Sequence, residues 1–143
     1  MNPKRLILAI IVVFAAMWAT DFLIHGVWLQ STYKETASLW RTEADMTAHM
    51  VWLFLGQLLA AATFVVIWSK GFPAVTSMGG SCLYGITMAL FAQANTLITY
   101  AVQPMPEILM LKWFIAGVVQ GLVLGMIVFL VGKPKATVAS SAA

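Results

Sequence analysis

Two acidic residues are each followed by a histidine four positions later. Asp21 and His25 lie inside the apolar stretch WATDFLIHGVW (residues 18–28), and Asp45 and His49 lie where another apolar stretch begins. On an α-helix this spacing places both side chains on one face. Carboxylate and imidazole groups suit proton exchange, or a divalent cation such as zinc or iron. Asp21, His25 and His49 are therefore candidates for a proton or metal-cation site.

The two histidines also permit other interpretations. We expect them on consecutive antiparallel helices at a similar depth, where His25 and His49 could be the axial ligands of one b-type haem. A structural network around Asp21 that sets the helix register is a further alternative. In that case Lys112 is the expected cationic partner of Asp21, because a charge inside a membrane has to be paired, protonated or hydrated.

The composition indicates that the solvent of this chain is lipid. Of 143 residues, 62% are hydrophobic and only 9% are charged, whereas soluble domains carry about 25% charged residues. The net charge of +3 is not arranged as a basic stripe with interleaved aromatics, so we expect no nucleic-acid partner. Nucleophile elbows, phosphate-binding loops and His-Glu-x-x-His helices are absent from the sequence. We therefore expect no enzymatic activity and assign no catalytic residues.

Four apolar stretches are long enough to cross a bilayer, which takes about 20 apolar residues per helix. The sequence therefore predicts an all-α protein, a single domain built as an antiparallel bundle of four transmembrane helices at about residues 5–30, 43–69, 75–102 and 106–131. Residues 32–41 are expected to form an interfacial segment, and residues 134–143 a flexible tail. Thr32 and Thr42 each precede an acidic residue by three positions, which predicts a helix cap at both.

Short loops predict the orientation, because cytoplasmic loops carry the excess of Lys and Arg. Lys4, Arg5, Lys70, Lys133 and Lys135 fall on one side, and Lys34 and Arg41 on the other. Both termini are therefore expected in the cytoplasm.

Polar residues within the spans gather in the outer half of the predicted bundle: Asp21, His25, His49, Asn95, Thr99 and Lys112. The inner half offers milder groups, namely Thr63, Ser81, Tyr84 and Thr87. A through-channel needs a polar lining along its whole length, so this asymmetry predicts a polar pocket at the outer surface instead. Gln57, Gln93 and Gln120 could bridge helices by hydrogen bonds.

Small residues at four-residue intervals predict close helix contacts. Gly117, Gly121 and Gly125 form a groove against which another helix can lie, either within the bundle or from a second copy of the chain. Gly56 and Ala60 form a similar stripe on the second span, on the face of His49, which is therefore expected to point into the bundle.

The runs DFLIHGVW and YKETASLWR resemble a pattern of small bacterial four-helix membrane proteins of unknown function. The resemblance covers the first span and the segment after it, about a third of the chain. It implies a bacterial inner (cytoplasmic) membrane and brings no assigned activity.

These observations predict a non-enzymatic accessory or interaction protein with an outer-side polar pocket. Its expected partners are the lipid bilayer and, beyond that, further copies of the chain or a larger membrane complex. Two alternatives stay open. One is a transporter-like or sensor protein that binds a proton or metal cation through Asp21, His25 and His49. The other is a haem membrane protein that uses the same two histidines. No cofactor beyond a metal ion or haem is suggested.

Overall fold

The computed structural model describes residues 1–71 and 77–132, and within these every regular element is a helix. The predicted all-α fold class is confirmed. The elements, in chain order, are α1 (Pro3–Asp21), the π-helix η1 (Phe22–Trp28), α2 (Gln30–Glu35), the 3-10 helix η2 (Ala37–Leu39), α3 (Glu43–Ala48), α4 (Met50–Gly71), α5 (Met78–Val102) and α6 (Glu107–Gly132). The first two residues predicted for the third span, and the predicted tail at 134–143, lie outside the described residues.

Four helical stretches are long and apolar enough to cross a bilayer: Pro3–Trp28, Met50–Gly71, Met78–Val102 and Glu107–Gly132. Helices satisfy their backbone polar groups internally, which lipid requires. Large apolar side chains cover the outside of the bundle; Phe91, for example, is 79% exposed. In water such a surface would be unstable, but acyl chains solvate it. The chain is a multi-pass membrane protein.

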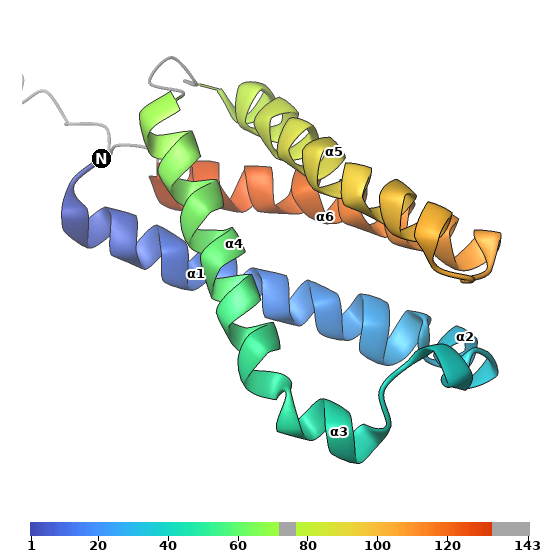
Figure 1. Ribbon diagram of the computed structural model, residues 1–143. Coiled ribbons are helices and arrows are strands. Elements are labelled where there is room, and N and C mark those ends of the chain that lie inside the picture. Colours follow the sequence, from blue (N-terminus) through green and yellow to red (C-terminus); the bar gives the residue numbers. More distant parts are fainter. Residues whose placement is uncertain (72–76, 133–143) are drawn as a thin grey trace, which may run out of the picture.

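The helices are arranged as a tight pair with two further helices packed on it (Figure 1). α5 and α6 run antiparallel side by side, α1 lies along α6, and α4 crosses α1 at a steep angle. The N-terminus and the last turn of α6 lie at the same end, which we call the terminal end. The opposite end, where α2 and the α5–α6 connection lie, is the distal end. Towards its start, α4 diverges from the α5–α6 pair and leads back to α3.

The apolar core occupies the terminal half and draws on all four long helices. Its buried members are Ala9 and Val13 of α1, Ala61, Phe64, Val65 and Trp68 of α4, Tyr84 of α5, and Leu124 and Val128 of α6. Two polar side chains there bond to neighbouring helices. Ser81 receives a hydrogen bond from Trp68 Nε1 (2.8 Å) and donates to the carbonyl oxygen of Gly125 (2.7 Å), and Tyr84 donates to the carbonyl oxygen of Phe64.

Glycines allow the backbones of α5 and α6 to touch in this half. A methyl group on Gly121 would lie 2.4 Å from Cβ of Ala89 and 2.5 Å from the carbonyl oxygen of Gly85. One on Gly125 would lie 2.4 Å from the carbonyl oxygen of Ser81. Side chains larger than hydrogen are therefore excluded from this contact.

The polar segment after the first span differs from its prediction. Thr32 does not cap a helix. It is buried inside α2, because the preceding π-helical turn continues into α2 and already supplies acceptors: Leu29 N–H donates to Ile24 O (2.8 Å) and Tyr33 N–H to Leu29 O (3.0 Å). The cap at Thr42 is confirmed, since its side chain accepts from the N–H of Asp45 (3.3 Å).

The small stripe on the second span makes no close helix contact inside this chain. Gly56 and Ala60 are both exposed, and a methyl group on Gly56 would meet nothing within 4 Å. The expectation that this face turns into the bundle was wrong, because the first half of α4 diverges from α5 and α6.

Candidate functional site

Asp21 forms a polar junction between three helices. Its Oδ1 accepts a hydrogen bond from Gln120 Nε2 of α6 (2.7 Å), and its Oδ2 accepts one from Gln57 Nε2 of α4. Gln120 Nε2 also donates to Thr20 Oγ1 (2.7 Å). Two amide groups thus compensate one carboxylate at a depth where an isolated charge is costly. The sequence singled out both glutamines as bridges between helices but did not join them to Asp21.

The predicted pairing of Asp21 with Lys112 does not occur. Lys112 Nζ lies 3.2 Å from Thr32 Oγ1 and 5.9 Å from the ring centroid of Trp28. Among the described residues no ion pair involves Asp21; both ion pairs there involve Asp45. The reason is depth. Gln120 follows Lys112 by eight residues, so it lies about 12 Å further along α6 at a rise of 1.5 Å per residue.

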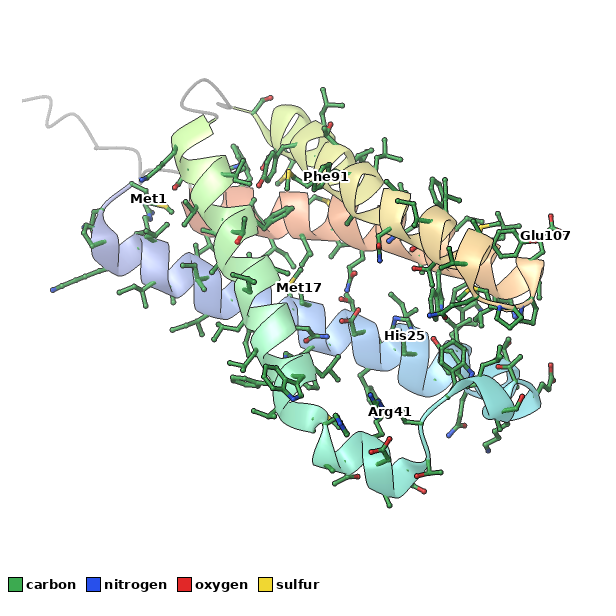
Figure 2. The ribbon with its side chains drawn as sticks, viewed as in Figure 1. Met1, Met17, His25, Arg41, Phe91 and Glu107 are labelled. Carbon is green, nitrogen blue, oxygen red and sulfur yellow. The ribbon has the colours of Figure 1, made fainter. Side chains whose placement is uncertain are left out.

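His25 lies in the π-helical segment that begins directly after Asp21. Its Nδ1 is 2.5 Å from the hydroxyl oxygen of Tyr33, which also accepts a hydrogen bond from Trp113 Nε1 (2.8 Å). Figure 2 shows His25 on the side of η1 that faces α5 and α6. Short π-helical stretches inside membrane or soluble helices often mark functional sites, because the widened turn redirects the side chains after it.

Aromatic side chains join the distal connection to α6. The rings of Tyr33 and Trp40 are 5.4 Å apart, and those of Trp40 and Trp113 are 5.8 Å apart. Burial raises the pKa of Tyr33 to about 12; the hydrogen bond from Trp113 opposes this shift and the negative charge of Asp21 adds to it. Tyr33 therefore stays a neutral donor and acceptor at physiological pH.

His49 lies apart from this junction, at the break between α3 and α4. Its Nδ1 is 2.7 Å from the carbonyl oxygen of Asp45 and 3.2 Å from a carboxylate oxygen of the same residue. Asp45 also pairs with Arg41 (2.7 Å), whose hydrogen bond lowers the pKa of Asp45 below its usual value. The side chain of His49 is 43% exposed and does not point into the bundle as predicted.

The structure does not gather the predicted ligands of a cofactor. In the part of the chain that is described, no three His, Cys, Asp or Glu side chains form a group that could hold a metal ion, so Asp21, His25 and His49 are not a common ligand set. A haem does not fit either. The cavity beside His25 has a volume of about 160 Å³, too small for the macrocycle, and His49 does not line it.

That cavity lies between η1, α5 and α6 in the distal half. Its polar lining consists of His25, Gln93, Thr96, Trp113 and Gln120, and its apolar lining of Ile24, Ala116 and Gly117. Gln93 packs directly on Gly117, because a methyl group on that glycine would lie 1.9 Å from Gln93 Nε2. Thr96 Oγ1 donates to Gln93 Oε1 (2.7 Å).

The polar residues that α5 contributes differ from those predicted. Asn95 is exposed and Thr99 does not line the cavity; Gln93 and Thr96 line it instead. A signal for this choice exists in the sequence. Ser81, Gly85, Ala89 and Gln93 follow one another at intervals of four and share a face, and that face packs on Gly125, Gly121 and Gly117 of α6. All three of those glycines thus lie against α5 of the same chain.

No family model, curated protein or solved structure matches this chain. The candidate site thus consists of a carboxylate held by two amides and, next to it, a small cavity with a mixed polar lining that is joined to the carboxylate through Gln120.

Proposed function

We propose that this protein is a non-enzymatic accessory protein of a bacterial inner membrane, and that it binds a small polar ligand in the distal cavity. The observation that carries the proposal is the cavity itself, about 160 Å³ with five polar side chains around it. The terminal half of the bundle, by contrast, is held mainly by apolar packing and by contact between the α5 and α6 backbones. Binding sites commonly combine a mostly apolar wall with a few convergent polar groups in this way.

Native mass spectrometry of the gently solubilised protein tests this function. The wild type is expected to release a bound small molecule that Ala116→Leu does not carry, because Ala116 is 8% exposed and lines the cavity, so a larger side chain fills it. Val119→Leu is the matched control, since Val119 lies on the same helix and is 54% exposed. Identical spectra from the wild type and Ala116→Leu would contradict the proposal.

We further propose that the distal end faces outwards and both termini face the cytoplasm, as the distribution of Lys and Arg favours. Impermeant maleimide labelling of intact cells tests this orientation in a Cys82→Ala background. Ser38→Cys in η2 is expected to react in intact cells, and Asn2→Cys only after the membrane is permeabilised. The reverse pattern would invert the topology and place the cavity on the cytoplasmic side.

Proton binding at Asp21 is a second candidate function. It is preferred to cation binding because, in the part of the chain that the structure describes, no second acidic or imidazole side chain joins Asp21 in a ligand group for a metal. Infrared difference spectra between acidic and alkaline pH are expected to show a carboxylic acid band that Asp21→Asn removes and Asp45→Asn retains. A band unchanged in Asp21→Asn would exclude this candidate.

A further inference from the structure

The tautomer of His25 follows from its neighbours. The indole N–H of Trp113 can only donate, so the oxygen of Tyr33 accepts from it. The hydroxyl of Tyr33 has no other acceptor among the described residues, so its proton is assigned to Nδ1 of His25, 2.5 Å away. A neutral imidazole that accepts at Nδ1 carries its proton on Nε2. The Nε2 atom of His25, the ring nitrogen left for a ligand in the cavity, is therefore an N–H donor.

The other polar residues of the wall leave both donors and acceptors unused. Gln120 uses its amide nitrogen on Thr20 and Asp21, and its carbonyl oxygen has no partner among the described residues. Gln93 has the opposite arrangement: its carbonyl oxygen accepts from Thr96, and its amide nitrogen has no partner in the same part of the chain. Thr96 keeps its oxygen lone pairs as acceptors.

With His25 neutral, none of the residues that line the cavity carries a formal charge. The nearest carboxylate, Asp21, is held by Gln57 and Gln120, and the ammonium group of Lys112 is engaged by Thr32 and Trp28 outside the wall. A charged ligand would meet no counter-ion in this wall, so its charge would be left uncompensated. A neutral ligand that donates and accepts would satisfy the wall.

We propose, on the premise that the cavity is a binding site as argued above, that its ligand class is a small uncharged molecule carrying a primary carboxamide. The carboxamide carbonyl accepts from His25 Nε2 or Gln93 Nε2, and its NH₂ group donates to Gln120 Oε1 or Thr96 Oγ1. The size agrees with this class. A cavity of about 150 Å³ in another protein admits benzene, so one of about 160 Å³ accommodates roughly six non-hydrogen atoms.

Three probes of nearly equal size and different charge test the ligand class: butyramide, butyrate and butylammonium. Each is titrated into the purified full chain in detergent while the thermal unfolding temperature is measured, since a ligand that binds the native state raises it. Only butyramide is expected to raise it. Thr96→Val is expected to weaken butyramide binding about fivefold, the value of one neutral hydrogen bond. Ala116→Leu is expected to abolish binding.

Thr87→Val is the matched control for Thr96→Val. Thr87 lies on the same helix, is exposed and donates to Leu83 of its own helix, so butyramide affinity should not change. If Ala116→Leu does not fold, the comparison between Thr96→Val and Thr87→Val decides alone. Equal loss in both variants, or none in either, would overturn the assignment.

The remaining outcomes separate this inference from the proposed function. Binding of butyrate or butylammonium that Ala116→Leu abolishes would overturn the neutral carboxamide class and leave the cavity as a binding site. Binding of butyramide that Ala116→Leu leaves intact would place it elsewhere and overturn the inference. If none of the probes binds, the carboxamide class is wrong, and the native mass spectrum decides whether the cavity holds another ligand or water only.

Discussion

The contact between α5 and α6 differs between the two ends of the bundle. In the terminal half, α5 and α6 meet backbone to backbone at Gly85 and Gly121, and the buried hydroxyls of Ser81 and Tyr84 donate to carbonyl oxygens. In the distal half, the same face of α5 presents Gln93 to Gly117, and a cavity lies beside them.

The difference arises from a single change along one helix face. Ser81, Gly85 and Ala89 are small enough for direct contact with α6, whereas Gln93 is a long amide at the next position of the same stripe. Its side chain fills the space over Gly117 and brings polar atoms between the helices. Polar groups in lipid need partners, and at the cavity the amide nitrogen of Gln93 and the carbonyl oxygen of Gln120 have none among the described residues. The terminal half is thus a packed scaffold, and the distal half keeps the hydrogen-bonding capacity that binding requires.

Disrupting the glycine contact should have the largest effect on stability. Gly121→Ala places a methyl group against Ala89 Cβ and the Gly85 carbonyl oxygen, neither of which is a flexible side-chain end. We expect the free energy of unfolding in detergent to fall by about 3 kcal/mol, as overpacked sites do. Gly79→Ala on α5 is the control, because its methyl group meets nothing within 4 Å and should not destabilise. Equal stability of the two variants would mean that the helices do not touch here.

Removing the carboxylate of the distal junction should have a smaller effect. Asp21→Leu deprives Gln57 and Gln120 of their common acceptor, and interhelical hydrogen bonds in membranes contribute modestly, so we expect a loss of about 1–2 kcal/mol. Asp21→Asn retains one acceptor oxygen and should lose less. The same unfolding assay measures both, with Glu35→Gln as the control, because Glu35 is exposed and its side chain makes no hydrogen bond or ion pair with the described residues. A loss in Asp21→Leu that exceeded the loss in Gly121→Ala would show that the polar junction, not backbone contact, dominates stability.

The smallest effect is expected at the Tyr33 hydroxyl. Tyr33→Phe leaves the N–H of Trp113 without its acceptor, which costs about 1 kcal/mol. The substitution also removes a contribution of Tyr33 to the pH dependence of the folding stability. The pKa of Tyr33 is raised from 10.0 to about 12 in the folded chain, so the unfolded chain releases this proton first. The stabilisation from Tyr33 is present below pH 10 and is lost as the pH rises towards 12.

Alkaline thermal melts measure this contribution. The unfolding temperature of the wild type should fall more steeply between pH 10 and 12 than that of Tyr33→Phe, and Tyr100→Phe should follow the wild type. Parallel curves for the wild type and Tyr33→Phe would show that the Tyr33 hydroxyl is accessible to water and does not join His25 to Trp113.

The sequence indicated where polar residues lie along each helix, but it did not indicate their direction around the helix axis. His25 lines the distal cavity, yet on α5 the cavity is lined by Gln93 and Thr96 and not by Asn95 or Thr99. The stripe from Ser81 to Gln93 was visible in the sequence. The helix face on which this stripe packs, however, could be recognised only from the structure, which places α5 against Gly117, Gly121 and Gly125 of α6.

The sequence by itself determined the solvent, the helical class and the four long spans, because these depend on the apolar content and length of each segment. Tertiary structure alone decided which polar residues meet. A helix that is apolar on every side carries no periodic signal for its inward face, so the choice of Gln57 and Gln120 over Lys112 for Asp21 depended on how the helices pack. The π-helical turn after Asp21 was likewise decided by the tertiary structure, and His25 within it lies beside Tyr33.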